Sequence, residues 1–157
     1  MLKKATELHR QGGLLVEVIP YNHSLLATLR AMLASQNYMG IEQIENETLP
    51  EFGYIAVKTN ESDLIEPIAA GFLRRLEGGF AQFDTLVSNA KMPSKDRHEG
   101  ISAVIDSLTN KAKELNIRGI LATTEDKSVI VRAKSLGFRV VDNLTVIAMP
   151  LKRESHV

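Results

Sequence analysis

The sequence of 157 residues contains no cysteine. This absence excludes a disulfide framework, a thiolate nucleophile and every metal site built from thiolates. The four histidines are scattered along the chain, with no two of them four positions apart and no HExxH sequence. We therefore expect no metal site in this protein.

The sequence also lacks an excess of either charge. Its 19 Lys and Arg residues balance its 19 Asp and Glu residues, so no overall field attracts nucleic acid or an anionic membrane surface. Residues 1–11 mix charged residues with single apolar ones and contain no apolar stretch typical of a signal peptide. We therefore expect a cytoplasmic protein that has no membrane span and does not use nucleic acid as a partner.

What is present is ordinary for a globular protein, with 44% apolar and 24% charged residues. A chain of this length buries a substantial core within one domain. We therefore expect a single domain over residues 1–157, in which residues 1–13 form an N-terminal extension or a short helix and residues 152–157 form a loose tail.

The first half of the chain alternates strand and helix patterns. β-Branched apolar residues predict a strand over residues 14–19, and apolar residues at helical spacing predict a helix over residues 25–33. Residues 35–50 are predicted to form a short second helix or a mobile loop. A turn at Gly78-Gly79 then helps to join three antiparallel strands. These strands are expected over residues 52–58, 67–76 and 80–88.

The second half predicts a strand, helix and strand in succession, followed by another helix. Residues 89–98 are polar and precede an amphipathic helix. Residues 118–123 form the next strand, which should be parallel to the strand before the helix. Asp126 is expected to cap the following helix and Gly137 to end it. A terminal hairpin is expected from two short strands, residues 139–141 and 144–151.

The segment Ser94–Ser102 lies between the predicted buried strand and the amphipathic helix. The first turn of a helix has N–H groups without internal partners and the positive end of the helix dipole, which together favour a phosphate. Gly100 leaves room for a pyrophosphate, and Arg97, Lys95 and Lys91 add positive charge. Without further context, RxxG more often reflects an exposed arginine and a local bend. Neither GxxxxGK[ST] nor GxGxxG opens this helix, which argues against ATP hydrolysis and dinucleotide binding.

Three features resemble the GNAT family of acetyltransferases. Arg97-His98-Glu99-Gly100-Ile101-Ser102 is similar to the family's Q/RxxGxG/A loop, with serine where glycine or alanine is usual. The strand that ends with Leu86-Val87-Ser88 stands where family members pair their main chain with the pantetheine arm of the cofactor. Ala133-Lys134-Ser135-Leu136-Gly137-Phe138 is similar to the family's last helix and its Leu-Gly-Phe turn.

The resemblance implies a GNAT fold, which is an α/β protein with a mostly antiparallel sheet and a parallel strand–helix–strand unit at the cofactor site. It implies acetyl-CoA as the cofactor and a small-molecule or protein amine as the acceptor, with direct attack and no covalent enzyme intermediate. The cofactor-binding residues that it implies are Leu86, Val87, Ser88, Arg97, His98, Glu99, Gly100, Ile101, Ser102 and Asp126.

The resemblance is incomplete at the catalytic positions. Family members commonly have an asparagine and a tyrosine at the positions that align with Asp126 and Ala133, and the tyrosine often protonates the departing thiolate. Ala133 therefore removes the usual acid. The sequence gives no reason to choose among three substitutes, Tyr21, Tyr38 and Tyr54.

An amine with a pKa near ~10.4 must lose a proton before it attacks, either to a carboxylate or to a water chain. Asp84 and Glu77 are the candidate bases near the fourth predicted strand, and Asp84 is the stronger candidate. A backbone N–H near Val87 or Ser88 is expected to polarise the thioester oxygen. Two alternative functions stay open: a catalytically weak or inactive GNAT-like domain that binds CoA in a structural or regulatory role, and acyl transfer to a nucleic acid base or tRNA, which a neutral chain without a basic stripe disfavours. A homodimer formed through edge strands or terminal hairpins is also open.

Overall fold

The computed structural model describes residues 8–11, 14–60, 62, 64–124 and 127–141. These residues belong to two compact units, Met1–Ala122 and Thr123–Val157. The expectation of a single domain over residues 1–157 stays a prediction.

Within its described residues, the first unit contains a six-stranded sheet whose strands lie side by side in sequence order. Neighbouring strands are antiparallel except β5 and β6, which are parallel. This arrangement confirms the predicted α/β fold with a mostly antiparallel sheet. The strands are β1 (Leu8–Gln11), β2 (Leu14–Pro20), β3 (Phe52–Thr59), β4 (Ile65–Arg75), β5 (Phe80–Ser88) and β6 (Gly119–Leu121).

β1 was not predicted. Residues 8–11 were expected in an N-terminal extension or a short helix, but they pair antiparallel with β2, from Leu8 opposite Glu17 to Gln11 opposite Leu14. The residues His9-Arg10-Gln11 show no apolar alternation, and edge strands commonly carry such charged and polar residues. β2 to β5 lie within two residues of their predicted bounds.

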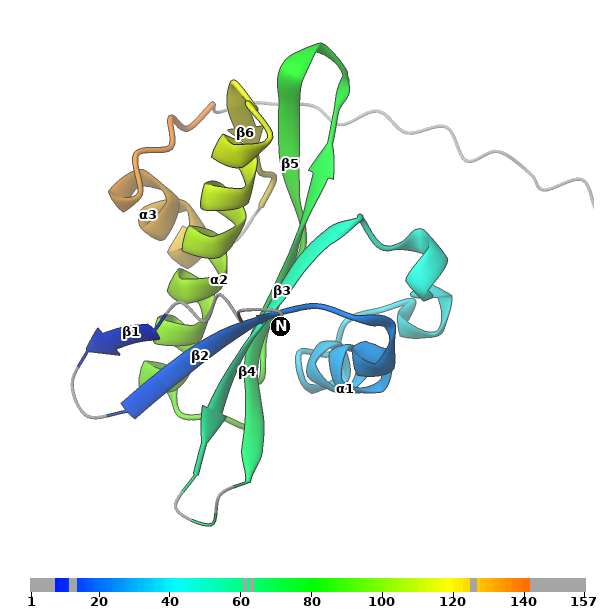
Figure 1. The fold of residues 1–157 in the computed structure, drawn as a ribbon, viewed down its shortest axis with the longest axis vertical. Coiled ribbons are helices and arrows are strands. Elements are labelled where there is room, and N and C mark those ends of the chain that lie inside the picture. Colours follow the sequence, from blue (N-terminus) through cyan, green and yellow to red (C-terminus); the bar gives the residue numbers. More distant parts are fainter. Residues whose placement is uncertain (1–7, 12–13, 61, 63, 125–126, 142–157) are drawn as a thin grey trace, which may run out of the picture. The chain divides into compact units, whose positions relative to one another are not determined.

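Two longer helices cover opposite faces of the sheet in the first unit (Figure 1). Val104 of α2 and Leu73 of β4 are fully buried on one face, which we call the α2 face. Leu29 of α1 and Phe72 of β4 are fully buried on the other, the α1 face. The helical elements of this unit are η1 (His23–Leu25), α1 (Leu26–Ser35), η2 (Ile41–Gln43), η3 (Asn46–Thr48), η4 (Glu77–Gly79) and α2 (Ser94–Glu114).

The segment between α1 and β3, predicted as a short helix or a mobile loop, contains the two 3-10 turns η2 and η3. Arg30 of α1 ties this segment down, because its Nε and Nη2 both donate to the carbonyl of Ile44, at 3.0 and 2.7 Å. Isoleucine and leucine side chains of the segment pack against the α1-face core.

α2 begins earlier than predicted. Residues 94–98 were assigned to the polar segment before the helix, but they already form its first turn, directly after Pro93. Proline fits at this end because its missing N–H would have no partner inside the helix. The β5–α2–β6 unit is parallel, as predicted, although β6 is shorter than the expected strand over residues 118–123.

The second unit contains α3 (Lys127–Ser135), which confirms the predicted helix. Gly137 has φ 89°, and the N–H of Phe138 donates to the carbonyl of Ala133 at 3.0 Å, which is the expected glycine-ended C-terminus. Residues 139–141 form no strand, in contrast to the prediction. Residues 144–151 and the tail at 152–157 lie outside the described residues.

Candidate cofactor-binding and catalytic site

Beyond Gln82, β5 continues without β6 beside it. The parallel pairing begins at Phe80 and ends where Gln82 lies opposite Leu121. β5 itself runs on to Ser88 and stays paired with β4 on its other side. Among the described residues, Leu86–Ser88 therefore have a neighbouring strand on one side only. A strand edge of this kind can bind an extended ligand through main-chain hydrogen bonds.

A bulge in β5 lies just before this open edge. Asp84 stands opposite Phe72 of β4. Val87 stands opposite Ala70, so β5 has one residue more than β4 between the two pairs. We assign the extra residue to Thr85, because its φ of 48° lies in the left-handed region that β-branched residues rarely adopt. The bulge places Asp84 and Val87 on the same face, beside the fully buried Phe72.

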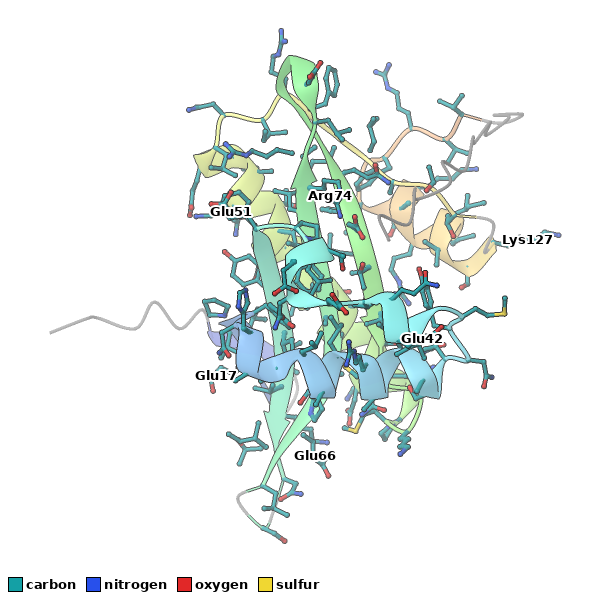
Figure 2. The ribbon with its side chains drawn as sticks, turned by 90° about the vertical axis from the view of Figure 1, so that its right-hand side faces the viewer. Glu17, Glu42, Glu51, Glu66, Arg74 and Lys127 are labelled. Atoms are coloured by element: carbon teal, nitrogen blue, oxygen red, sulfur yellow. The ribbon has the colours of Figure 1, made fainter. Side chains whose placement is uncertain are left out.

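Asp84, a predicted base, has both carboxylate oxygens occupied. Arg74 Nε donates to Oδ2 at 2.7 Å, and the Thr85 hydroxyl donates to Oδ1 at 2.7 Å. Arg74 Nη2 also donates to the carbonyl of Thr48 in η3 at 3.2 Å, on the face that Figure 2 views. The side chain of Asp84 is 26% exposed. Asp84 is thus part of a hydrogen-bonded network that links β5, β4 and η3.

The N-terminus of α2 follows β5 after a short connection, residues 89–93. Pro93 is the N-cap residue, and no side chain caps the helix. Since the N–H of Arg97 donates to the Pro93 carbonyl at 3.0 Å, the N–H groups of the three residues between them have no partner within the helix. Such groups, here on Ser94, Lys95 and Asp96, can bind an anion together with the helix dipole, so the predicted anion site stays a prediction with suitable geometry.

The one carboxylate in the first turn of α2 is neutralised by a partner from the sheet. Asp96 is only 4% exposed, and its Oδ2 accepts a hydrogen bond from Lys58 Nζ of β3 at 2.9 Å. An opposite charge at this distance compensates the buried carboxylate. The Asp96 charge therefore does not stand unopposed against an anion at the helix end.

Residues 97–102 lie within the first turns of α2 and not in a loop. Arg97 is half-buried, and its Nε is a buried nitrogen without a hydrogen-bond partner. His98 is exposed, Ser102 is half-buried, and Glu99 lies 3.9 Å from the amine of the lysine four residues earlier. Buried polar groups are rarely left unpaired, so the unsatisfied Arg97 Nε is consistent with an anion-binding site at this position.

Gly100 has a role in packing that the sequence did not indicate. A Cβ added to it would lie 2.5 Å from Ile68 Cγ2 and 3.3 Å from Ala69 Cβ. Gly100 therefore allows α2 to approach β4 closely, and its predicted role at the pyrophosphate stays a prediction. Ile101 belongs to the buried α2-face core.

The end of α1 holds the end of β5 and the connection that follows. Gln36 Nε2 donates to the Ser88 carbonyl at 2.9 Å and to Ser88 Oγ at 3.2 Å. The N–H of Ala90 donates to Ser35 Oγ at 3.0 Å. These contacts join residues 52 and 55 positions apart, so no local sequence pattern indicates them. Sequence reasoning also missed Thr85 and Lys58 at this site, and it did not pair Arg74 with Asp84.

The other predicted catalytic residue, Glu77, is not brought to the open edge. It lies in the η4 turn, at the opposite end of β5 from Ser88. A strand of this length spans roughly 30 Å, which separates Glu77 from the edge. Asp126, predicted to bind the cofactor, lies outside the described residues.

The three tyrosines occupy different places. The Tyr21 hydroxyl donates to Asn46 Oδ1 at 2.9 Å, and its ring meets Phe72 edge-on at 4.9 Å between centroids. Burial raises the pKa of the Tyr21 phenol, an effect that the positive charge of Arg30 partly offsets. Tyr54 packs against the α2-face core, and Tyr38 is exposed. Tyr21 thus packs on the same face of the sheet as Asp84.

The part of the chain that the structure describes contains neither a group of metal ligands nor a candidate membrane-spanning helix. No group of three His, Cys, Asp or Glu residues there is arranged to hold a metal ion. No helix among the same residues has the length and apolar character needed to cross a membrane.

No protein-family model matches the sequence, and no curated protein matches it. Solved structures match well in shape. A GNAT-family acetyltransferase of Staphylococcus aureus Mu50 superposes with a TM-score of 0.61 at 19% identity, over 82% of this chain and 87% of the other. A GNAT-family protein of Streptococcus pneumoniae TIGR4 gives 0.64 at 14% identity, over 88% and 99%. A Mycobacterium tuberculosis protein in complex with CoA gives 0.61 at 16% identity, over 83% and 76%.

These likenesses, together with the sheet order and the parallel β5–α2–β6 unit, show that the chain has the GNAT fold. This confirms the fold that the sequence motifs predicted. At such low identities the likeness establishes the architecture and leaves the chemistry to be argued from the site itself.

Proposed function

We propose that this protein is an acetyl-CoA-dependent N-acetyltransferase. The observation that carries the proposal is the succession of an open β5 edge, a short connection and an uncapped α2 N-terminus. Acetyl-CoA matches this succession, because its extended, amide-containing arm leads to a pyrophosphate. The CoA complex of the Mycobacterium tuberculosis protein, which has the same fold, supports this class of cofactor.

The residues around the edge suit the two parts of such a ligand. The main chain of Leu86–Ser88 would pair with the extended arm, as in strand addition. The N–H groups of Ser94–Asp96 would hold the pyrophosphate, with Arg97 supplying charge and the donor that now lacks a partner. Lys95 and Lys91 are exposed and add positive charge at the rim.

Bound acetyl-CoA supplies the thioester: the amine nitrogen forms a bond to the acetyl carbon, the carbon–sulfur bond breaks, the amine loses a proton and the leaving sulfur gains one. A backbone N–H near Val87 or Ser88 polarises the thioester oxygen. The Asp84 carboxylate is held by Arg74 and Thr85, and protonation would weaken both hydrogen bonds, so we assign removal of the amine proton to water at the edge.

Cofactor binding is tested by thermal unfolding with and without acetyl-CoA, since a ligand of the folded state raises the unfolding temperature. Arg97→Glu reverses the charge at the pyrophosphate and is expected to weaken binding by at least about tenfold, measured by calorimetry with CoA. Lys113→Glu, the same reversal near the other end of α2, is the matched control. Equal affinities of the two variants would show that the anion site is placed wrongly.

Turnover is tested by thiol release from acetyl-CoA over a panel of diamines, amino sugars and lysine peptides. Release above the rate without an amine supports acetyl transfer. Binding without release by any amine in the panel would instead favour a domain that binds CoA in a structural or regulatory role.

A further inference from the structure

Thr85 is in an unfavourable backbone conformation at a place where the sheet does not require one for packing. Its φ of 48° is the conformation that glycine adopts freely and a β-branched residue avoids. It is also the residue directly before the open edge at Leu86–Ser88. Residues in such conformations persist only where their surroundings hold them, and they concentrate at functional sites.

A clamp of three side-chain contacts surrounds this residue. The Thr85 hydroxyl donates to Asp84 Oδ1, and Arg74 fixes the other oxygen of Asp84 through Nε. Arg74 is in turn anchored to the carbonyl of Thr48 in η3. Asp84 is thus the centre of a line of contacts that runs from the bulge to a turn on the α1 face.

We propose that Asp84 is a positioning residue, which with Arg74 holds Thr85 in its left-handed conformation and so sets the direction of the main chain at Leu86–Ser88. This inference rests on the proposed function, because that edge is where the cofactor would bind. Taking a proton would weaken the hydrogen bonds that the Asp84 carboxylate accepts from Arg74 and Thr85, so we assign Asp84 to positioning and not to removal of the amine proton.

The proposal makes a substitution at Thr85 the decisive test. Glycine holds a positive φ without help, so in a Thr85→Gly protein the clamp has nothing to enforce. Loss of Asp84 should then lower neither kcat/KM for acetyl-CoA nor the unfolding temperature. If Asp84 were instead the catalytic base, its loss would lower the rate whether position 85 is threonine or glycine.

The experiment compares the wild type, Asp84→Asn, Thr85→Gly and the double variant, with Glu114→Gln as a control carboxylate on the exposed end of α2. Thiol release from acetyl-CoA is measured with the fastest amine of the panel, from pH 6 to pH 9. We expect Asp84→Asn to lower kcat/KM for acetyl-CoA by about tenfold or more, and the double variant to recover to within about threefold of Thr85→Gly, because the two residues act as one unit. The pH profile should keep its shape in the double variant.

A double variant as slow as Asp84→Asn, or a pH limb that disappears with Asp84, would overturn the proposal. The same four proteins are also unfolded thermally without any ligand. Asp84→Asn should lower the unfolding temperature in the presence of Thr85 and change it little in the Thr85→Gly protein; equal decreases would also overturn the clamp. Because this second measurement needs no cofactor, the clamp is tested even if acetyl-CoA does not bind and the proposed function fails.

Discussion

Two explanations account for the glycine at position 100, namely close packing of α2 on β4 and room for a pyrophosphate, and they predict different effects of a substitution. A glycine in a helix interior normally costs about 1 kcal/mol relative to alanine. Here, however, the space for a Cβ is already filled by Ile68 of β4. The residue is therefore explained by the contact between α2 and the sheet, and the ligand is not needed to account for it.

Gly100→Ala is expected to destabilise the protein by about 1–3 kcal/mol through overpacking, in spite of the better helix propensity of alanine. Urea unfolding measures this change, and Asn110→Ala on the exposed side of α2 is the control, for which stability should stay the same or rise. If Gly100→Ala left stability unchanged but weakened CoA binding, the glycine would serve the pyrophosphate after all.

At the scale of elements, α2 is tied to β3 by the ion pair of Asp96 and Lys58. Both side chains are largely buried, at 6% and 17% exposure. The pair connects the first turn of α2, where the proposed anion site lies, to the middle of the sheet. Breaking one side of such a pair leaves a buried charge without compensation.

Lys58→Met is expected to destabilise the protein by about 3–5 kcal/mol, because Asp96 then stays buried without its partner. The double variant Lys58→Met with Asp96→Leu should recover much of that loss, and denaturant unfolding of the three proteins checks both values. A single variant as stable as the wild type would mean that water reaches Asp96. Lys113→Met, which removes an exposed lysine near the other end of α2, is the control.

For the whole molecule, stability should decrease in alkaline solution. Burial raises the pKa of the Tyr21 phenol in the folded state above its usual value near 10. As the pH rises past 10, the unfolded chain releases this proton first, so the stability present below that pH is lost as the pH approaches the folded-state pKa. The Lys111 pKa is also raised, mainly by its hydrogen bond with Glu114, and acts in the same direction.

Tyr21→Phe is expected to make the fall in unfolding temperature between pH 9 and pH 11 shallower, and Glu114→Gln to remove the contribution that Lys111 gains from its hydrogen bond with Glu114. Ultraviolet absorbance of the phenolate in the folded protein locates the tyrosine titration directly. An unchanged slope in Tyr21→Phe would show that the buried phenol does not govern the alkaline limb.

Local patterns predicted the parts of the fold that are built from local physics. β2 to β5, α3 and the glycine at 137 follow from side-chain alternation, helical spacing and a positive φ, and the structure confirms them. β1 was not predicted from the sequence, because an edge strand needs few apolar residues. The start of α2 was misplaced because Ser94–His98 is polar and therefore lacks the apolar spacing of a buried helix. The first turn of a helix can nevertheless be polar where it is exposed to solvent.

The site was predictable only in outline. The order of strand, connection and helix is a property of the sequence, and it predicted the strand end and the helix N-terminus that make up the candidate site. The partners of Asp84, Asp96 and Ser88 come from strands and turns far along the chain, so only the folded structure pairs them. Glu77 was selected by its nearness in sequence to β5, which says nothing about the end of the strand at which it lies.

The bulge has a consequence for how this sheet tolerates deletions. If Thr85 were removed, Asp84 would still stand opposite Phe72 and Val87 opposite Ala70, with Leu86 alone facing the residue between them. Every side chain of β5 would keep its face, and the core would lose nothing. Thr85 thus adds nothing to the core, and its backbone is in an unfavourable conformation. We therefore attribute its role to the direction that it gives the free edge of β5.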